Sequence, residues 1–319
     1  MKDNFNEMNT LPTVQLFILS RDRVDYCRQT VESAVKQTYK NIEIIVSDNS
    51  EKDNVEEMLT REFPEVTVIR RKPTLPALEH FNTLIAEATA PLLVLFHDDD
   101  TLHSDYVSSM VDIIIRNSDV AAVGCNAYVT KGLNTTQEYF MGIFQGTLKI
   151  NNPIDFLEPY LSLSLMCPAP FPGYMYRTHA IKNLTLEKNK GGKHADVSFL
   201  LSLISRASIL WIDKCLFDYR YHAGSDSSKE SIGDRLSWLR YICITYNMPP
   251  KSFPVMEYKY MYWFNWLSQS THLLSLSSFL NLIYSRRARV AIMFIFCFSI
   301  RLACTKTYFW HRLLRAAIR

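Results

Sequence analysis

The chain has 319 residues, of which 48% are hydrophobic and 21% are charged. This composition is ordinary for a globular protein and excludes a disordered or low-complexity chain, and the length leaves room for two domains. The net charge is only +3, but the charges are unevenly placed. The C-terminal tail, residues 258–319, is basic and rich in apolar residues, which indicates an anionic partner surface such as lipid. We expect no nucleic-acid partner. Beyond Glu257 the tail has no acid and nine basic residues: Lys259, Arg286, Arg287, Arg289, Arg301, Lys306, Arg312, Arg315 and Arg319.

The cysteines and the N-terminus both indicate a reducing compartment. The chain has 7 cysteines, and no two of them show the C-x-x-C spacing of a zinc or redox motif. An odd number without that spacing disfavours a disulfide framework. Residues 1–10 are polar and lack the apolar core of a secretion signal. We therefore expect a cytoplasmic protein.

Up to residue 130, short apolar runs alternate with segments whose apolar residues recur at helical spacing. Strands are predicted at residues 14–20, 42–47, 66–70, 92–97 and 121–127. Helices are predicted at residues 27–35, 54–62, 77–88 and 104–116. The alternation predicts an α/β fold with a mostly parallel sheet flanked by helices.

Beyond residue 130 the alternation breaks down. Residues 131–194 are rich in proline and glycine, and long irregular segments of this kind often shape a binding site in a compact enzyme. A helix is predicted at residues 196–206, strands at 209–212 and 216–221, and helices from residue 231 onward.

Polar residues stand at the carboxyl ends of the predicted strands, where an open parallel sheet binds its ligands. The second strand is followed by Asp48, and the third ends in Arg70 and Arg71. No glycine-rich dinucleotide or P-loop motif follows the first strand. The fourth strand ends in the run 97–100, HDDD.

This run of one histidine and three aspartates has two interpretations. Adjacent carboxylates at the end of a buried strand repel one another, and a divalent cation with oxygen ligands would relieve that repulsion. The run could instead be a solvated acidic loop that caps the following helix. Spacing alone leaves both interpretations open.

Four segments, taken in order, resemble the landmarks of family 2 glycosyltransferases with the GT-A fold. They are TVESAVKQTYKNIEIIVSDNS, FHDDDTLHSDYV, HADVSFLLSLI and LFDYRYHAGSDS. The resemblance implies a GT-A nucleotide-sugar-binding catalytic domain over residues 12–228 and a helical C-terminal region over residues 229–319. Two positions depart from the family pattern: His97 stands where aspartate is common, and Ala195 stands where glutamate is common.

The resemblance also implies roles at the donor site. Asp48 would accept a hydrogen bond from the nucleobase of a nucleotide-sugar donor. Asp99, together with Asp98, would hold a metal ion, Mg²⁺ or Mn²⁺, that bridges the donor diphosphate. Asp100 would complete the metal site or touch the donor sugar.

Three further roles follow from the same resemblance. Asp196 would be the catalytic base that deprotonates the acceptor hydroxyl, and Arg71 and His222 would lie near the diphosphate. These roles agree with the chemistry, because a cation stabilises the leaving diphosphate and a carboxylate can activate an incoming hydroxyl.

Each of these residues also has a plain structural interpretation. Asp48 could begin a polar turn, and Asp196 could cap the helix that follows it. His222 could be the partner of a nearby carboxylate. Arg70 and Arg71 could form a solvated strand end.

The resemblance predicts an inverting glycosyltransferase that moves a sugar from a nucleotide-diphosphate donor to a hydroxyl of a glycan acceptor. We expect the acceptor to be lipid-linked and to belong to surface polysaccharide biosynthesis, such as O-antigen or capsule synthesis. Two alternative functions differ from this one in the residues that they require. A nucleotidyltransferase would need a glycine-rich loop after the first strand, which SRDRVDY does not offer, and a non-catalytic membrane adaptor would have no use for the acidic residues.

The tail contains the apolar run VAIMFIFCFSI at residues 290–300. As a helix this run would rise about 16 Å, whereas the hydrocarbon core of a membrane is about 30 Å thick. We therefore expect the run to lie along the inner face of the membrane rather than to cross it. The alternative is a buried helix that packs on the catalytic domain or in the interface of a homo-oligomer.

Overall fold

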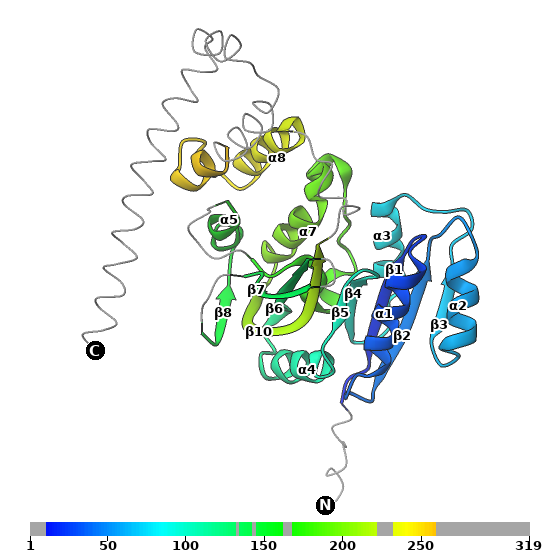
Figure 1. Ribbon diagram of the computed structural model, residues 1–319. Helices are drawn as coiled ribbons and strands as arrows, with labels where there is room; N and C mark the ends of the chain where they lie inside the picture. Colours follow the sequence, from blue (N-terminus) through cyan, green and yellow to red (C-terminus); the bar gives the residue numbers. More distant parts are fainter. Residues whose placement is uncertain (1–10, 132–133, 142–144, 162–167, 222–231, 260–319) are drawn as a thin grey trace, which may run out of the picture. The chain divides into compact units, whose positions relative to one another are not determined.

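The computed structural model describes residues 11–131, 134–141, 145–161, 168–221 and 232–259. The chain divides into two compact units. The first comprises Met1–Tyr160 and Met166–Glu230, and the second comprises Leu161–Leu165 and Ser231–Arg319. Figure 1 shows the described helices and strands in colour.

The first unit is built on a mixed sheet with strand order β3-β2-β1-β4-β9-β6-β10-β5, in which β7 also pairs with β6 and β8 with β10. Its first half is parallel and consists of β1 (Val14–Ser20), β2 (Ile42–Asp48), β3 (Thr67–Arg70) and β4 (Leu92–His97). Every residue of β1 is buried, because the strand is central and is covered on both faces.

The second half of the sheet mixes strand directions. β6 (Val120–Lys131) and β10 (Ser208–Tyr221) are parallel, but β9 (Tyr174–Arg177) lies between β4 and β6 and is antiparallel to both. Three more strands, β5 (Thr101–Leu102), β7 (Asn134–Tyr139) and β8 (Thr147–Ile150), add antiparallel pairs. The predicted α/β fold with a mostly parallel sheet is confirmed.

The prediction of two separate strands at residues 209–212 and 216–221 is wrong. These residues belong to the single strand β10, whose register on β6 shifts between Ile212 and Cys215 and again between Cys215 and Asp218. Such irregularities bend a strand and interrupt its apolar pattern without ending its pairing.

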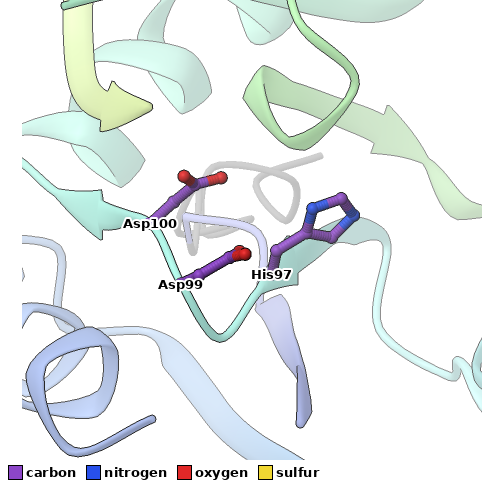
Figure 2. A group of neighbouring side chains, drawn as sticks. All are labelled: His97, Asp99 and Asp100. Carbon is purple, nitrogen blue, oxygen red and sulfur yellow. The ribbon is translucent and has the colours of Figure 1, made fainter. Parts of the chain in front are cut away.

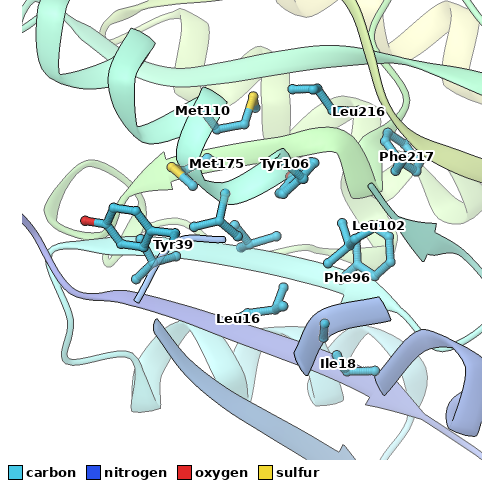
Figure 3. Packing of buried hydrophobic residues seen from close by; sticks show 14 of the residues in the cluster. Leu16, Ile18, Tyr39, Phe96, Leu102, Tyr106, Met110, Met175, Leu216 and Phe217 are labelled. Carbon is cyan, nitrogen blue, oxygen red and sulfur yellow. The ribbon is translucent and has the colours of Figure 1, made fainter. Parts of the chain in front are cut away.

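One face of the sheet is covered by α1 (Val24–Val35), α2 (Asn54–Glu62) and α4 (Tyr106–Arg116). Leu16 and Ile18 of β1, Phe96 of β4 and Met110 of α4 belong to one buried cluster (Figure 3). Phe17, between the two β1 residues, is equally buried but lies outside that cluster. It faces the opposite side, because successive side chains of a strand alternate.

The opposite face carries α3 (Ala77–Glu87) and α7 (Ala195–Ile204). The ring of Phe81 on α3 contacts His97 at the end of β4, and the ring of Phe199 on α7 contacts Tyr176 of β9. Two shorter helices, α5 (Pro153–Leu161) and α6 (Thr178–Ile181), lie on either side of β9 in the chain.

The described part of the second unit is helical and includes α8 (Ile232–Thr245). The buried ring of Trp238 lies 5.7 Å from that of Tyr258, and Nη1 of Arg235 donates a hydrogen bond to the Tyr258 hydroxyl at 3.1 Å. No helix among the described residues is both long and apolar enough to cross a membrane. The basic tail, including the apolar run at residues 290–300, lies outside the described residues.

Candidate active site

The loops that follow β1, β2 and β4 meet at one edge of the sheet, because these strands are neighbours and run parallel. Ser20 at the end of β1 is paired with Asp48 at the end of β2, and Leu19 is paired with His97 at the end of β4. The structure therefore brings together the polar strand ends that the sequence singled out.

Asp48 is fully buried and held on both of its carboxylate oxygens. Nη1 of Arg70 lies 2.6 Å from Oδ2, and Oδ1 accepts hydrogen bonds from the hydroxyl of Ser50 at 2.5 Å and from its backbone N–H at 3.0 Å. The side chain of Arg70 is only 9% exposed, so the interpretation of Arg70 as a solvated strand end is wrong. These contacts fix the orientation of the carboxylate.

Arg71 turns away from Asp48 and pairs with α3. Its guanidinium donates two hydrogen bonds to Glu87, at 2.7 and 2.5 Å, and its Nε donates to Oγ of Ser47 at 2.8 Å. The same Ser47 oxygen lies 2.7 Å from Nε2 of His80. Burial lowers the pKa of His80 to about 4, and the charge of Arg71 acts in the same direction. A role of Arg71 at the diphosphate stays a prediction.

The turn after β4 carries three buried carboxylates. Oδ2 of Asp98 accepts a hydrogen bond from the backbone N–H of Arg21 at 3.1 Å, and Oδ1 forms an ion pair with Nη2 of Arg23. Nη1 of Arg23 lies 2.6 Å from Oδ2 of Asp99. Burial raises the pKa of Asp98 to about 6, and the charge of Arg23 opposes this shift.

His97, Asp99 and Asp100 form a group suited to a metal ion. One ligand atom from each side chain lies within 4.8 Å of the others, and Figure 2 shows the three side chains turned toward a common space. Oδ1 of Asp100 accepts a hydrogen bond from the backbone N–H of Arg220 at 2.8 Å, whereas its buried Oδ2 receives none from the described residues.

A cation would satisfy that oxygen. Burial and the neighbouring Asp99 both raise the pKa of Asp100 well above its ordinary value, which is the electrostatic cost that a bound cation removes. The two carboxylates suit Mg²⁺ or Mn²⁺, because both ions favour oxygen ligands. The imidazole of His97 suits Mn²⁺ better than Mg²⁺, since transition metals also accept nitrogen ligands.

Asp196 lies in the first turn of α7, and His194 rather than Asp196 occupies the position that precedes the helix. Burial raises the pKa of Asp196, while His194, the backbone N–H of Val197 and the more distant His97 act in the opposite direction. Nδ1 of His194 lies 3.1 Å from the hydroxyl of Tyr160. A carboxylate that has a raised pKa and interacts electrostatically with His97 is suited to proton transfer.

His222, predicted to lie near the diphosphate, falls outside the described residues. Two arginine side chains without a predicted functional role form ion pairs with the site carboxylates: Arg23 pairs with Asp98 and Asp99, and Arg70 pairs with Asp48. Both arginines stand at or just after the end of a strand, at the edge of the sheet where the acidic residues also gather, and this placement is the signal that the sequence offers. The sequence could not show which carboxylates they would reach.

The comparisons with known proteins agree with this architecture. The model of the family described as glycosyl transferase family 2 matches residues 16–206, which is more than half of the chain. A curated protein of Rickettsia felis, named an uncharacterized glycosyltransferase, is 22% identical over 227 residues. That match covers 69% of this chain but only 35% of the relative, so the chain spans about a third of the relative's length.

Two solved structures share the fold. S. aureus TarS in complex with UDP-GlcNAc has a TM-score of 0.57 and 14% identity, over 77% of this chain and 71% of that one. The mannosyltransferase PcManGT of Pyrobaculum calidifontis, in complex with GDP-Man and Mn²⁺, has a TM-score of 0.51 and 13% identity, over 90% of this chain and 84% of that one.

Proposed function

Because the chain belongs to glycosyltransferase family 2, we propose that it is an inverting, metal-dependent enzyme that transfers a sugar from a nucleotide-diphosphate donor to a glycan hydroxyl. One observation supports this proposal most directly. Asp48 and the turn His97–Asp100 follow neighbouring parallel strands and therefore lie at the same edge of the sheet. Open sheets bind nucleotides at such an edge. Two structures with the same fold contain UDP-GlcNAc or GDP-Man.

The donor would lie across the ends of β1, β2 and β4. Asp48 is fixed by Arg70 and Ser50. Its Oδ1 already accepts two hydrogen bonds, but Oδ2, which pairs with Arg70, keeps a lone pair that could accept a hydrogen bond from a nucleobase N–H. Asp99 and Asp100, with His97, would hold Mg²⁺ or Mn²⁺. A divalent cation there would stabilise the negative charge that develops on the departing diphosphate.

Asp196 would take the proton from the acceptor hydroxyl. Its interaction with His97 supports a place for this base close to the proposed metal site. The acceptor hydroxyl would then attack the anomeric carbon opposite the leaving diphosphate. A single displacement of this kind inverts the configuration at that carbon. The raised pKa of Asp196 makes its carboxylate a stronger base than an ordinary exposed aspartate.

For the acceptor we propose a lipid-linked glycan of surface polysaccharide biosynthesis, with the enzyme held at the inner face of the membrane. The support is the sequence of the tail, where basic residues flank an apolar run too short to span a bilayer.

The direct test is a panel of UDP-, GDP- and dTDP-sugars incubated with the protein and Mn²⁺, with release of nucleoside diphosphate as the readout. We expect one donor class to be consumed, and we expect chelation with excess EDTA to abolish the reaction. Asp99→Asn should lose the metal-stimulated reaction while keeping its melting temperature within a few degrees. Full turnover in excess EDTA would remove the metal from the mechanism.

A further inference from the structure

Arg23 links two carboxylates that have different roles in the proposed site. Its Nη2 pairs with Asp98, which is fully buried and lies outside the His97, Asp99 and Asp100 group. Its Nη1 lies 2.6 Å from Oδ2 of Asp99, which belongs to that group. One guanidinium therefore contacts both a member of that group and a neighbouring carboxylate outside it, and the predicted role of Asp98 at the metal stays a prediction.

The two contacts differ in how firmly they are held. The second oxygen of Asp98 is bound by the backbone N–H of Arg21, so the carboxylate is tied to the β1–α1 loop at both oxygens. Asp99 is 9% exposed, compared with 0% for Asp98. Breaking the pair with Asp98 would leave a buried charge without its counter-ion, which is costly. The pair with Asp99 is the one that can be given up at lower cost.

A cation bound by Asp99 would lie close to this guanidinium. The metal ion and the guanidinium of Arg23 would repel each other, because both are positively charged and solvent screens charges incompletely in a partly buried site. Both would also interact with the carboxylate of Asp99. The negative charge of a nucleoside diphosphate would offset the repulsion. Arg23 is thus placed to oppose binding of the metal alone more than binding of the metal together with the nucleotide.

We propose that Arg23 is an internal counter-cation that competes with the divalent ion for Asp99 and thereby couples metal binding to nucleotide binding. In the metal-free protein it offsets part of the negative charge of the acidic turn. When the ion enters, Arg23 keeps Asp98 and gives up Asp99. The inference rests on the metal site of the proposed function, but it concerns affinity and is tested without sugar transfer.

The test measures Mn²⁺ affinity of the full-length protein by calorimetry, first without nucleotide and then with saturating UDP or GDP. Arg23→Gln should bind Mn²⁺ roughly threefold to fivefold more tightly than wild type without nucleotide, the size expected for losing one partly exposed ion pair. The factor by which nucleotide strengthens Mn²⁺ binding should shrink correspondingly.

The matched control is Arg21→Gln. Arg21 lies in the same loop and carries the same charge, but its side chain is half exposed, and within the described part of the chain it forms ion pairs with Asp22 and Glu51 rather than with the acidic turn. The Arg21→Gln variant should bind Mn²⁺ with the same affinity as wild type. If Arg23→Gln does not fold, Arg23→Lys replaces it, because lysine keeps the charge, reaches one carboxylate and should tighten binding by a smaller factor.

Equal or weaker nucleotide-free Mn²⁺ binding by the Arg23 variant, relative to Arg21→Gln, overturns the proposal. Undetectable binding in both variants overturns it as well. Failure of the proposed function would look different: wild-type protein would release no nucleoside diphosphate from any donor, whatever its Mn²⁺ affinity.

Discussion

Asp196 has a pKa that burial raises, and among the described residues no ion pair holds its side chain. Asp196→Asn preserves its shape and removes the base. Loss of a general base typically lowers turnover about 10²–10⁴-fold, and we expect a loss in that range with donor affinity almost unchanged. Rapid-quench turnover and calorimetric titration of the donor separate the two effects. Native turnover by the variant would mean that another group is the base.

The pH dependence of turnover follows from the same residue. Only the carboxylate form of Asp196 can accept the proton, and burial raises its pKa, so turnover should fall as the pH drops through that raised value. We measure kcat against pH at saturating donor and expect the midpoint of its acid limb to lie above about 4, the ordinary pKa of aspartate. The residual rate of Asp196→Asn should lack this limb. An acid limb at or below the ordinary value in wild type would contradict the assignment.

The partners of the site arginines show the limit of sequence reasoning at the residue scale. Arg70 and Arg71 are adjacent at a strand end, so their side chains leave in different directions. Arg70 binds Asp48, whereas Arg71 binds Glu87 on α3. A pattern of residue types predicts that charges gather at this edge, but rotamers and packing decide which carboxylate each arginine reaches.

At the scale of elements, α1 is tied to the acidic turn through Thr30. Its buried hydroxyl lies 2.8 Å from the carbonyl oxygen of Asp98 and 2.6 Å from that of Asp100. Thr30→Val keeps the shape and leaves two buried carbonyls without this donor. An unsatisfied buried acceptor costs about 1–3 kcal/mol, so we expect a destabilisation of that size and weaker Mn²⁺ binding. Chemical denaturation and calorimetry measure the two.

The control for this variant is Thr83→Val. The hydroxyl of Thr83 donates to the carbonyl of Glu79 within α3, at an exposed position. This substitution should change stability by no more than about 0.5 kcal/mol and leave Mn²⁺ binding as it was. Equal effects of the two variants would show that the hydrogen bonds of Thr30 to the acidic turn contribute no more to stability and Mn²⁺ affinity than the hydrogen bond of Thr83 does.

The parallel half of the sheet could be predicted because each strand is one apolar run followed by a helix. The prediction matches β1 and β4 to the residue and α2 as well. β9 could not be predicted in the same way. It has only four residues, follows a segment rich in proline, and pairs with β4 about eighty residues earlier in the chain. Such a pairing depends on tertiary contacts that no local pattern encodes.

The acidic end of β4 was also predictable, because a buried apolar run leads directly into HDDD. The position of Asp196 beside this site could not be predicted in that way. α7 reaches the sheet through ring contacts of Phe199 with Phe171 and Tyr176, and those contacts join segments that the irregular stretch before α7 separates. Resemblance to a family, rather than periodicity, placed Asp196 among the candidate site residues.

At the scale of the whole molecule, the proposed association with a membrane rests on the sequence of the tail. Its charge is wholly basic beyond Glu257, and each Lys or Arg near an anionic membrane surface contributes about 1 kcal/mol to binding. Three arginines, Arg286, Arg287 and Arg289, precede the apolar run at residues 290–300. Changing all three to glutamine removes charge without removing the apolar run, and therefore separates the electrostatic from the apolar part of membrane binding.

We expect full-length wild-type protein to sediment with anionic liposomes at low salt and to be partly released at high salt, because salt screens surface charges. The triple glutamine variant should bind markedly less at low salt and show a smaller salt effect. Deletion of residues 285–319 should abolish sedimentation and leave metal-dependent donor hydrolysis measurable, because every described residue of the proposed site precedes residue 222. If the wild-type chain ignores anionic liposomes at low salt and remains in solution without detergent, the tail packs against protein. The acceptor would then have to be sought among glycans that are not bound to the membrane.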